Sequence, residues 1–137
     1  MPHEKELAAI SIFSRLEKDD LERLGKSVVQ RKYAKGDVIV KEGEQAVAFY
    51  VIVSGRVDVT KGGDKVGEKR AGEPFGEMAL LDGYPRSTTV IAAEDTECLV
   101  MTRWDFTAEL KTGNSIALAM LPELSKIIRR LEGESIP

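Results

Sequence analysis

The sequence FGEMALLDGYPRSTTV, at positions 75–90, is the most informative stretch of the 137-residue chain. It places Gly76 and Glu77 at the start of a predicted helical turn, and Arg86 nine residues after the glutamate. The free N–H groups and positive dipole end of a helix N-terminus suit a phosphate, and arginine adds a planar, charged donor fork for the same anion. A carboxylate would repel that phosphate, so Glu77 is better suited to accept a hydrogen bond from a sugar hydroxyl. The stretch therefore predicts a site for a nucleotide monophosphate.

The order of these residues resembles the phosphate-binding cassette of the cyclic nucleotide-binding domain family. That family includes the regulatory subunits of cyclic-AMP-dependent protein kinase and the bacterial catabolite activator protein. Its pattern is Phe-Gly-Glu-Leu-Ala-Leu, a short loop, and then Pro-Arg-Ala-Ala-Thr-Val, from which this chain departs at Met78, Ser87 and Thr88. Glycine turns elsewhere also fall where the family has its strand corners, so the resemblance runs over residues 7–131.

The resemblance implies a role for each matching position of the cassette. Arg86 would pair with the exocyclic phosphate and Glu77 with the ribose 2′-hydroxyl, while the N–H groups of Gly76 and Ala79 would approach the ligand. The alternatives are an ordinary surface arginine at position 86 and, at position 77, an acid that merely stabilises its own helix. The predicted ligand-binding residues are Phe75, Gly76, Glu77, Met78, Ala79, Arg86, Ser87 and Thr88.

Ser87 bears on the choice of base. In the family that the chain resembles, alanine at this position accompanies the cyclic-AMP kinases, threonine often accompanies cyclic GMP recognition, and serine occurs in the catabolite activator protein. A serine hydroxyl can bond the phosphate or the guanine amine, so cyclic AMP is the first expectation and cyclic GMP the second. Thr88 either contacts the ligand or faces the barrel. Further candidates for the base pocket, each more often a core residue, are Tyr33, Phe49, Tyr50, Val59 and Val66, with Leu124 and Ile128 as an apolar lid.

The predicted fold is mainly β with flanking α, an eight-stranded jelly-roll barrel with N-terminal helices and C-terminal lid helices. Short β-branched or aromatic segments separated by glycine turns are typical of such all-β folds. We expect one domain over residues 1–137, divided into N-terminal helices (1–26), a barrel (27–102) with the cassette at 75–89, and C-terminal helices (103–133). The expected strand segments are 28–33, 38–40, 49–53, 57–59, 90–92 and 98–101.

The helix ends carry local signals. Asp19 is expected to cap the second N-terminal helix and Gly25 to close it, and Thr102 is expected to begin a capping box. Pro122 lies inside the apolar stripe of the last helix. Because proline lacks an N–H and crowds the preceding turn, a kink or break is predicted there.

Composition excludes several classes of function. His3 is the sole histidine, so the ligand set of a metal-dependent cupin is absent, and no spacing supports a catalytic triad or paired carboxylates. We expect no enzyme activity, no metal and no cofactor, with cyclic AMP or cyclic GMP as the ligand. The rival reading is an interaction domain of the same fold that has lost ligand binding and acts through protein contacts.

Charge and cysteine content suggest the setting. A net charge of −3 argues against a nucleic-acid-coating surface, and Cys98, the single cysteine, permits no intramolecular disulfide, which favours a reducing, cytoplasmic compartment. No apolar run is long enough for a membrane span, so we expect no membrane partner. The sequence shows no helix-turn-helix, so an effector protein or a fused output domain is the expected partner.

Overall fold

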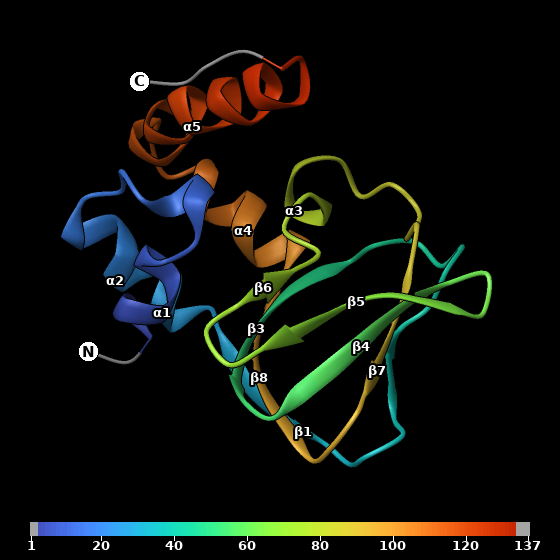
Figure 1. Ribbon diagram of the computed structural model, residues 1–137. Helices are drawn as coiled ribbons and strands as arrows, with labels where there is room; N and C mark the ends of the chain where they lie inside the picture. The colour runs from blue at the N-terminus through green and yellow to red at the C-terminus, as the bar shows by residue number, and fades with distance from the viewer. Residues whose placement is uncertain (1–2, 134–137) are drawn as a thin grey trace. The chain divides into compact units, whose positions relative to one another are not determined.

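The computed structural model describes residues 3–133 (Figure 1). Backbone contacts divide the chain into two compact units, one of residues 27–107 and one of residues 1–26 together with 108–137. The first unit holds the eight strands, and the described part of the second is helical.

The strands form two antiparallel sheets of four strands each. All three pairings of the first sheet, and two of the three pairings of the second, connect strands that are not consecutive in the sequence, so neither sheet is a simple succession of hairpins. The first sheet has the order β1 (Val29–Tyr33), β8 (Thr96–Thr102), β3 (Ala48–Ser54), β6 (Pro74–Phe75). The second has the order β2 (Val38–Val40), β7 (Thr89–Ala92), β4 (Arg56–Lys61), β5 (Asp64–Arg70).

Apolar side chains from both sheets form one core, so the sheets pack face to face. The central strand β3 is buried along most of its length, including Phe49 on the face opposite to Tyr50, and accordingly reads as a continuous apolar run. The core consists of Val40, Ala48, Tyr50, Ile52, Val57, Phe75, Val90, Cys98 and Val100. Burial raises the pKa of the Cys98 thiol to about 11, which keeps it protonated.

The predicted strand count and mainly β class are confirmed, but closure of a barrel is not. Within residues 3–133, no strand pairing joins one sheet to the other. The sequence prediction also missed β5 and β6. Strand β5 has the composition DKVGEKR, which is charged because it lies at the edge of its sheet, where charged side chains discourage pairing with another chain.

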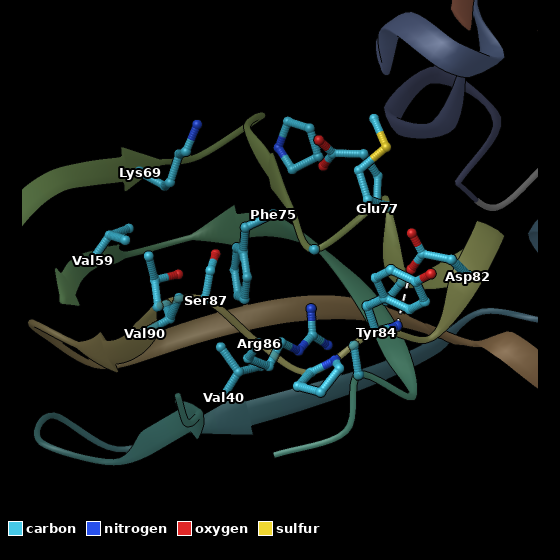
Figure 2. A pocket seen from close by; sticks show the side chains of 17 residues that line it. Val40, Val59, Lys69, Phe75, Glu77, Asp82, Tyr84, Arg86, Ser87 and Val90 are labelled. Atoms are coloured by element: carbon cyan, nitrogen blue, oxygen red, sulfur yellow. Dashed lines mark hydrogen bonds between the residues drawn. The ribbon is translucent and has the colours of Figure 1, made fainter. Parts of the chain in front are cut away.

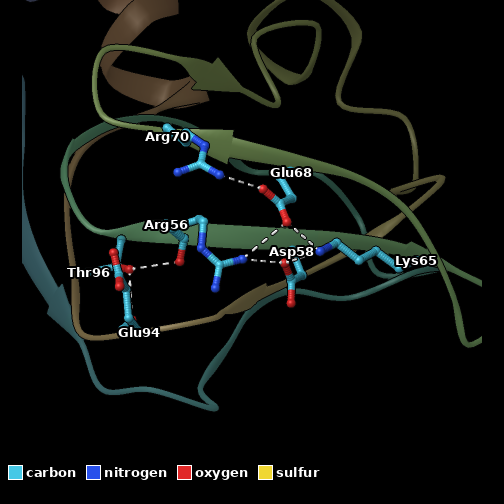
Figure 3. A network of polar contacts seen from close by, with 7 residues as sticks. All are labelled: Arg56, Asp58, Lys65, Glu68, Arg70, Glu94 and Thr96. Atoms are coloured by element: carbon cyan, nitrogen blue, oxygen red, sulfur yellow. Dashed lines mark hydrogen bonds and ion pairs between the residues drawn. The ribbon is translucent and has the colours of Figure 1, made fainter.

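Ion pairs cover the outer face of this edge (Figure 3). Glu68 contacts Arg56, Lys65 and Arg70, and Asp58 contacts Arg56 and Lys65, at N–O distances of 3.1–3.3 Å except for the shorter Lys65–Glu68 pair. Exposed pairs of this kind contribute little individually. The cluster favours an outward position for these side chains and so helps to fix which residues of β5 face inward.

The helical unit contains α1 (Glu4–Ala8), a 3₁₀ turn at Ser11–Phe13, α2 (Lys18–Lys26) and α5 (Ser115–Leu131), while α4 (Arg103–Leu110) spans the boundary between the units. Polar contacts tie the helices together, among them an Arg23–Glu109 ion pair at 3.4 Å. Arg15 pairs with Glu123, and the buried Asp20 accepts hydrogen bonds from Arg23 and from Ser115 of α5.

The helix-end predictions have mixed outcomes. The Thr102 cap is confirmed, since its Oγ1 accepts a hydrogen bond from the Asp105 N–H at 3.1 Å. The Asp19 and Gly25 predictions are wrong, because α2 begins at Lys18 and Gly25 lies inside it. Of the kink or break predicted at Pro122, the break is wrong, because α5 continues through it although proline has no N–H to donate.

A glycine in the tight turn between β3 and β4 provides a test of this packing. Gly55 has φ +95°, and an added Cβ would lie 2.5 Å from both the Asp95 carbonyl oxygen and Thr96 Oγ1. Gly55→Ala should therefore lower the free energy of unfolding by about 3 kcal/mol in urea titrations. Gly36 has a nearly equal φ of +94° but open space around it, so Gly36→Ala is the matched control and should cost about 1 kcal/mol. Equal losses would mean that the steric contact is unimportant.

Candidate functional site

A cavity of about 360 Å³ lies in the β unit, at the cassette (Figure 2). It is walled by the segment from β6 through α3 (Ala79–Asp82), by the loop that leads into β7, and by single residues of β2, β4 and β5. All eight predicted ligand-binding residues line it, although they come from two separated parts of the sequence. The sequence did not identify its further lining residues Val40, Ala46, Lys69, Pro74, Asp82, Tyr84, Pro85 and Val90.

Glycine at position 76 lets the backbone lie close to the Arg86 guanidinium. Gly76 has φ +77°, and a Cβ there would overlap Nη1 of Arg86. A residue with a side chain would therefore have to displace the guanidinium as well as adopt a strained backbone. Glycine directly after β6 thus leaves the space that the Arg86 guanidinium occupies.

Arg86 is held from behind by groups of β3. Its Nη2 donates a hydrogen bond to the Ala48 carbonyl, and its guanidinium carbon lies 5.9 Å from the centre of the Tyr50 ring. That ring stacks on Phe75 at 4.8 Å between centroids and 9° between planes. Burial lowers the pKa of Arg86 and the neighbouring Tyr50 raises it, but an arginine stays charged in either case. The cavity therefore contains a half-buried, fixed positive charge.

The loop that carries Arg86 is itself fastened to the segment between β2 and β3. The Arg86 N–H donates to the Glu44 carbonyl at 2.8 Å, and its carbonyl accepts from the Gly43 N–H at 2.9 Å. The Glu42 N–H donates to Thr89 Oγ1 at 3.0 Å, so this hydroxyl is engaged outside the cavity lining. Hydrogen bonds to both the N–H and the carbonyl of Arg86 limit how far the backbone of this arginine can move.

Glu77 has a carboxylate oxygen that the protein leaves unsatisfied. Its Oε2 is inaccessible to solvent, and no described residue donates a hydrogen bond to it. An unpaired buried acceptor costs about 1–3 kcal/mol, and native structures contain few of them. In contrast, the other carboxylate of the lining is occupied, because Asp82 Oδ1 accepts from the Tyr84 N–H at 3.0 Å. Glu77 therefore has room for a donor that the chain itself does not supply.

One expected donor is already engaged. The Ala79 N–H donates to the Gly76 carbonyl at 3.0 Å, and the Leu80 N–H donates to the Glu77 carbonyl at 3.1 Å. In this conformation the Ala79 N–H is thus engaged within the protein, and its approach to a ligand stays a prediction. The reason is that α3 begins within a tight turn whose first N–H groups are satisfied locally, which the helical pattern of the sequence does not reveal.

Most of the additional base-pocket candidates lie elsewhere. Val59 lines the cavity, but Phe49 is buried in the core, Val66 is 59% exposed, and Tyr50 lies behind Arg86 beside a smaller cavity of about 100 Å³. Tyr33 lines a different hollow together with Asp37 and Asp95. These aromatics are core or peripheral residues because strand aromatics usually serve packing.

The sequence of residues 30–112 matches the sequence model of the family described as "Cyclic nucleotide-binding domain". This chain belongs to that family. The match contains the whole cassette, so family membership rests on the same residues that line the cavity.

Curated relatives include kinase regulatory proteins. The chain is 36% identical over 99 residues to a cAMP-dependent protein kinase regulatory subunit of Mycosarcoma maydis, covering 69% of this chain and 19% of that protein. It is 31% identical over 124 residues to the corresponding subunit of Candida albicans, covering 90% of this chain and 27% of that protein. It is 34% identical over 113 residues to human cGMP-dependent protein kinase 2, covering 77% of this chain and 15% of that protein. The chain thus spans about a quarter or less of these relatives.

Solved structures share the fold at low sequence identity. The N-terminal domain of a transcriptional regulator from Streptomyces coelicolor A3(2) has a TM-score of 0.86 at 22% identity, with 93% of each chain covered. The sensor domain of the transcriptional regulator DNR from Pseudomonas aeruginosa has a TM-score of 0.73 at 23% identity, covering 98% of this chain and 99% of that one. At this identity the likeness establishes the fold alone.

Two classes of feature are missing from the part of the chain that the structure describes. Residues 3–133 contain no cluster of three or more His, Cys, Asp or Glu side chains that could hold a metal ion. None of the helices in this range combines the length and apolar composition that crossing a bilayer requires.

The stack behind Arg86 makes a testable prediction. Tyr50→Leu and Arg86→Met should show a coupling free energy of about 0.5–1 kcal/mol in a double-mutant cycle on stability, because each removes the partner of the other. Tyr50→Phe keeps the ring and should leave the effect of Arg86→Met unchanged. Strict additivity of the first pair would show that the ring does not hold the guanidinium.

Proposed function

We propose that this chain is a regulatory sensor module that binds a 3′,5′-cyclic nucleotide, with cyclic AMP the first candidate and cyclic GMP the second. The observation that carries the proposal is one cavity that combines a fixed, half-buried arginine with a buried carboxylate oxygen lacking a donor. A phosphate and a sugar hydroxyl of one ligand would satisfy both groups. Family membership and the likeness to regulators of cAMP- and cGMP-dependent kinases support it.

In this proposal Arg86 binds the exocyclic phosphate. One of its terminal nitrogens is committed to Ala48, and the stack on Tyr50 restrains the plane of the guanidinium. A preorganised fork loses less conformational entropy when the anion arrives. The ligand charge would also be neutralised in a site that is partly removed from water, where ion pairing is stronger than in bulk solvent.

Glu77 accepts a hydrogen bond from the ribose 2′-hydroxyl. Its negative charge makes it a poor neighbour for the phosphate and a strong acceptor for an O–H donor. The remaining cassette residues shape the cavity: Gly76 allows close approach, Met78 contacts the sugar, and Ser87 and Thr88 provide hydroxyls. Phe75 and Ala79 contribute apolar surface to the cavity wall. Phe75 is also stacked on Tyr50.

Regulation would follow from repositioning of the C-terminal helices. Binding that favours one of two helix positions biases that equilibrium by the difference in affinity between the two states. We further propose that residues 1–137 act as one cyclic nucleotide-binding domain without catalytic activity, in the cytoplasm. Its partner would be an effector protein or a fused output domain rather than nucleic acid or membrane, in keeping with relatives of which this chain matches only a part.

Arg86→Ala should reduce cyclic AMP affinity by at least about two to three decades, or 3–5 kcal/mol, because the phosphate would lose its charged partner. Isothermal titration calorimetry would measure the loss. Arg86→Lys should restore only part of it, because an ammonium lacks the planar fork. Arg70→Ala, which removes an exposed arginine of the outer ion-pair cluster, is the control and should bind normally. Unaltered binding by Arg86→Ala would reject the proposed phosphate site, and absence of binding by the unmodified chain would favour the interaction-domain alternative.

The sugar contact has its own test. Glu77→Gln should weaken cyclic AMP binding by about 1.5–3 kcal/mol, the scale of a hydrogen bond to a charged group. Loss of the 2′-hydroxyl in 2′-deoxy cyclic AMP should weaken binding to the unmodified chain and should have little further effect on the variant. If the two losses were additive in the titrations, Glu77 would not be the partner of that hydroxyl.

A further inference from the structure

Among the sulfur-containing side chains of residues 3–133, Met78 alone is exposed to solvent, and it lies in the wall of the cavity. It is 40% exposed, whereas Met101 and Met120 are 0% and 3% exposed. Met1, the fourth methionine, lies outside the described residues. Cys98 is buried, and because burial raises its pKa to about 11 it stays a protonated, poorly reactive thiol. An oxidant in solution therefore reaches the thioether of Met78 before the other described sulfurs.

The backbone holds this side chain at the cavity. Met78 directly precedes α3, and its carbonyl accepts hydrogen bonds from the N–H groups of Leu81 and Asp82 at 3.0 and 3.3 Å. The residue before it is fixed as well, since the Glu77 carbonyl accepts from the Leu80 N–H at 3.1 Å. A change in the polarity of the Met78 side chain is therefore not relieved by an easy shift of the chain, and it acts on the cavity.

A peroxide oxidises a thioether without help from another protein group. The sulfur lone pair attacks one peroxide oxygen, the O–O bond breaks as the S–O bond forms, and the second oxygen leaves as water with both protons. Sulfur loses two electrons and the peroxide gains them. Unlike a thiol, the thioether needs no deprotonation before it reacts, so exposure decides which methionine is oxidised.

A sulfoxide at this position would change the cavity wall in two ways. It replaces a flexible apolar surface with a polar, chiral group. It also adds an acceptor oxygen, and no donor, to a wall that already holds the unsatisfied Glu77 carboxylate. A cyclic nucleotide brings a further negative charge on its phosphate, so the added oxygen opposes binding.

We propose that Met78 is a modification site, at which a peroxide forms methionine sulfoxide in preference to the other described sulfurs and thereby weakens cyclic nucleotide binding about tenfold. The modification is reversible, because reductases return the sulfoxide to the thioether. The effect on affinity rests on the proposed function, whereas the selectivity of the oxidation does not.

Peptide mapping tests the selectivity. The full chain is treated with hydrogen peroxide, and the added oxygen atom is located by mass spectrometry of its peptides. Met78 should be oxidised at least about tenfold faster than Met101 and Met120 in the folded chain. In concentrated urea the three rates should become similar, because burial no longer protects two of them. Similar rates in the folded chain would reject the site.

Calorimetric titration with cyclic AMP tests the effect on affinity, each protein being compared with itself before and after peroxide. The unmodified chain should lose about tenfold in affinity, and the two methionine sulfoxide reductases with dithiothreitol should restore it. Met78→Leu has no sulfur to oxidise here, so its affinity, whatever its starting value, should not respond to peroxide. Met101→Leu keeps the exposed sulfur and is the matched control, with the same loss as the unmodified chain; Met120→Leu replaces it if it does not fold.

Three results would overturn the effect on affinity. The first is an oxidised chain that binds as before, and the second is an equal loss in Met78→Leu, which would assign the effect to another residue. The third is unfolding of the oxidised chain, whereas thermal melting within a few degrees of the untreated chain would support a local effect in the cavity.

Bound ligand links the oxidation to the cavity. Saturating cyclic AMP should slow the oxidation of Met78 in the unmodified chain, because the sugar covers the sulfur. The same concentration should give no protection in Arg86→Ala, in which the phosphate contact is lost. An unchanged rate with ligand bound to the unmodified chain would place the sulfur outside the occupied part of the cavity and count against the proposal.

Failure of this inference can be told from failure of the proposed function. If the unmodified chain binds cyclic AMP and Arg86→Ala abolishes that binding, the function stands whatever peroxide does. If the unmodified chain binds neither cyclic AMP nor cyclic GMP, the function and the effect on affinity are rejected together. Peptide mapping decides the selective oxidation of Met78 in both cases.

Discussion

The contact between the Arg86 guanidinium and the backbone of Gly76 is the constraint on which the cavity depends. It needs glycine at the end of β6, and the Ala48 carbonyl and Tyr50 ring of β3 fix the same guanidinium from behind. Since Tyr50 also stacks on Phe75, the two halves of the cassette share one support. A charged side chain can be half-buried here because its position is determined by the core rather than by its own flexible loop.

Around this fixed charge, the cavity is incompletely satisfied. Among residues 3–133, no group donates to the buried Glu77 oxygen and no carboxylate pairs with Lys69. Of the two lining carboxylates, Asp82 accepts a bond from within the protein, from the Tyr84 N–H. Unpaired polar groups cost stability. A ligand that supplies the missing partners recovers that free energy on binding, which is why the unsatisfied groups, rather than the satisfied ones, indicate its chemistry.

Local sequence patterns predicted helices and strands well where the residue types of a segment match its burial in the fold. Apolar segments such as Phe49–Val53 became core strands, and Thr102 capped its helix. Prediction failed where tertiary position overrides composition: β5 is charged because it is an edge strand, and Pro122 is tolerated because one missing hydrogen bond does not break a seventeen-residue helix. The engaged N–H of Ala79 was equally invisible, because it depends on how tightly the turn after Gly76 closes.

The sequence by itself determined the family, the mainly β class and the cassette, since these depend on residue types in a fixed order along one continuous stretch. Only the tertiary structure decided what else surrounds the cassette. Val40 and Ala48 are distant from it in sequence, Lys69 lies on the strand before it, and none of the three belongs to a motif. Strand pairing within each sheet and packing of the two sheets place them beside Arg86 or along the same cavity. The physical reason is that a binding cavity is defined by surfaces that meet in space, while a sequence pattern records only neighbours along the chain.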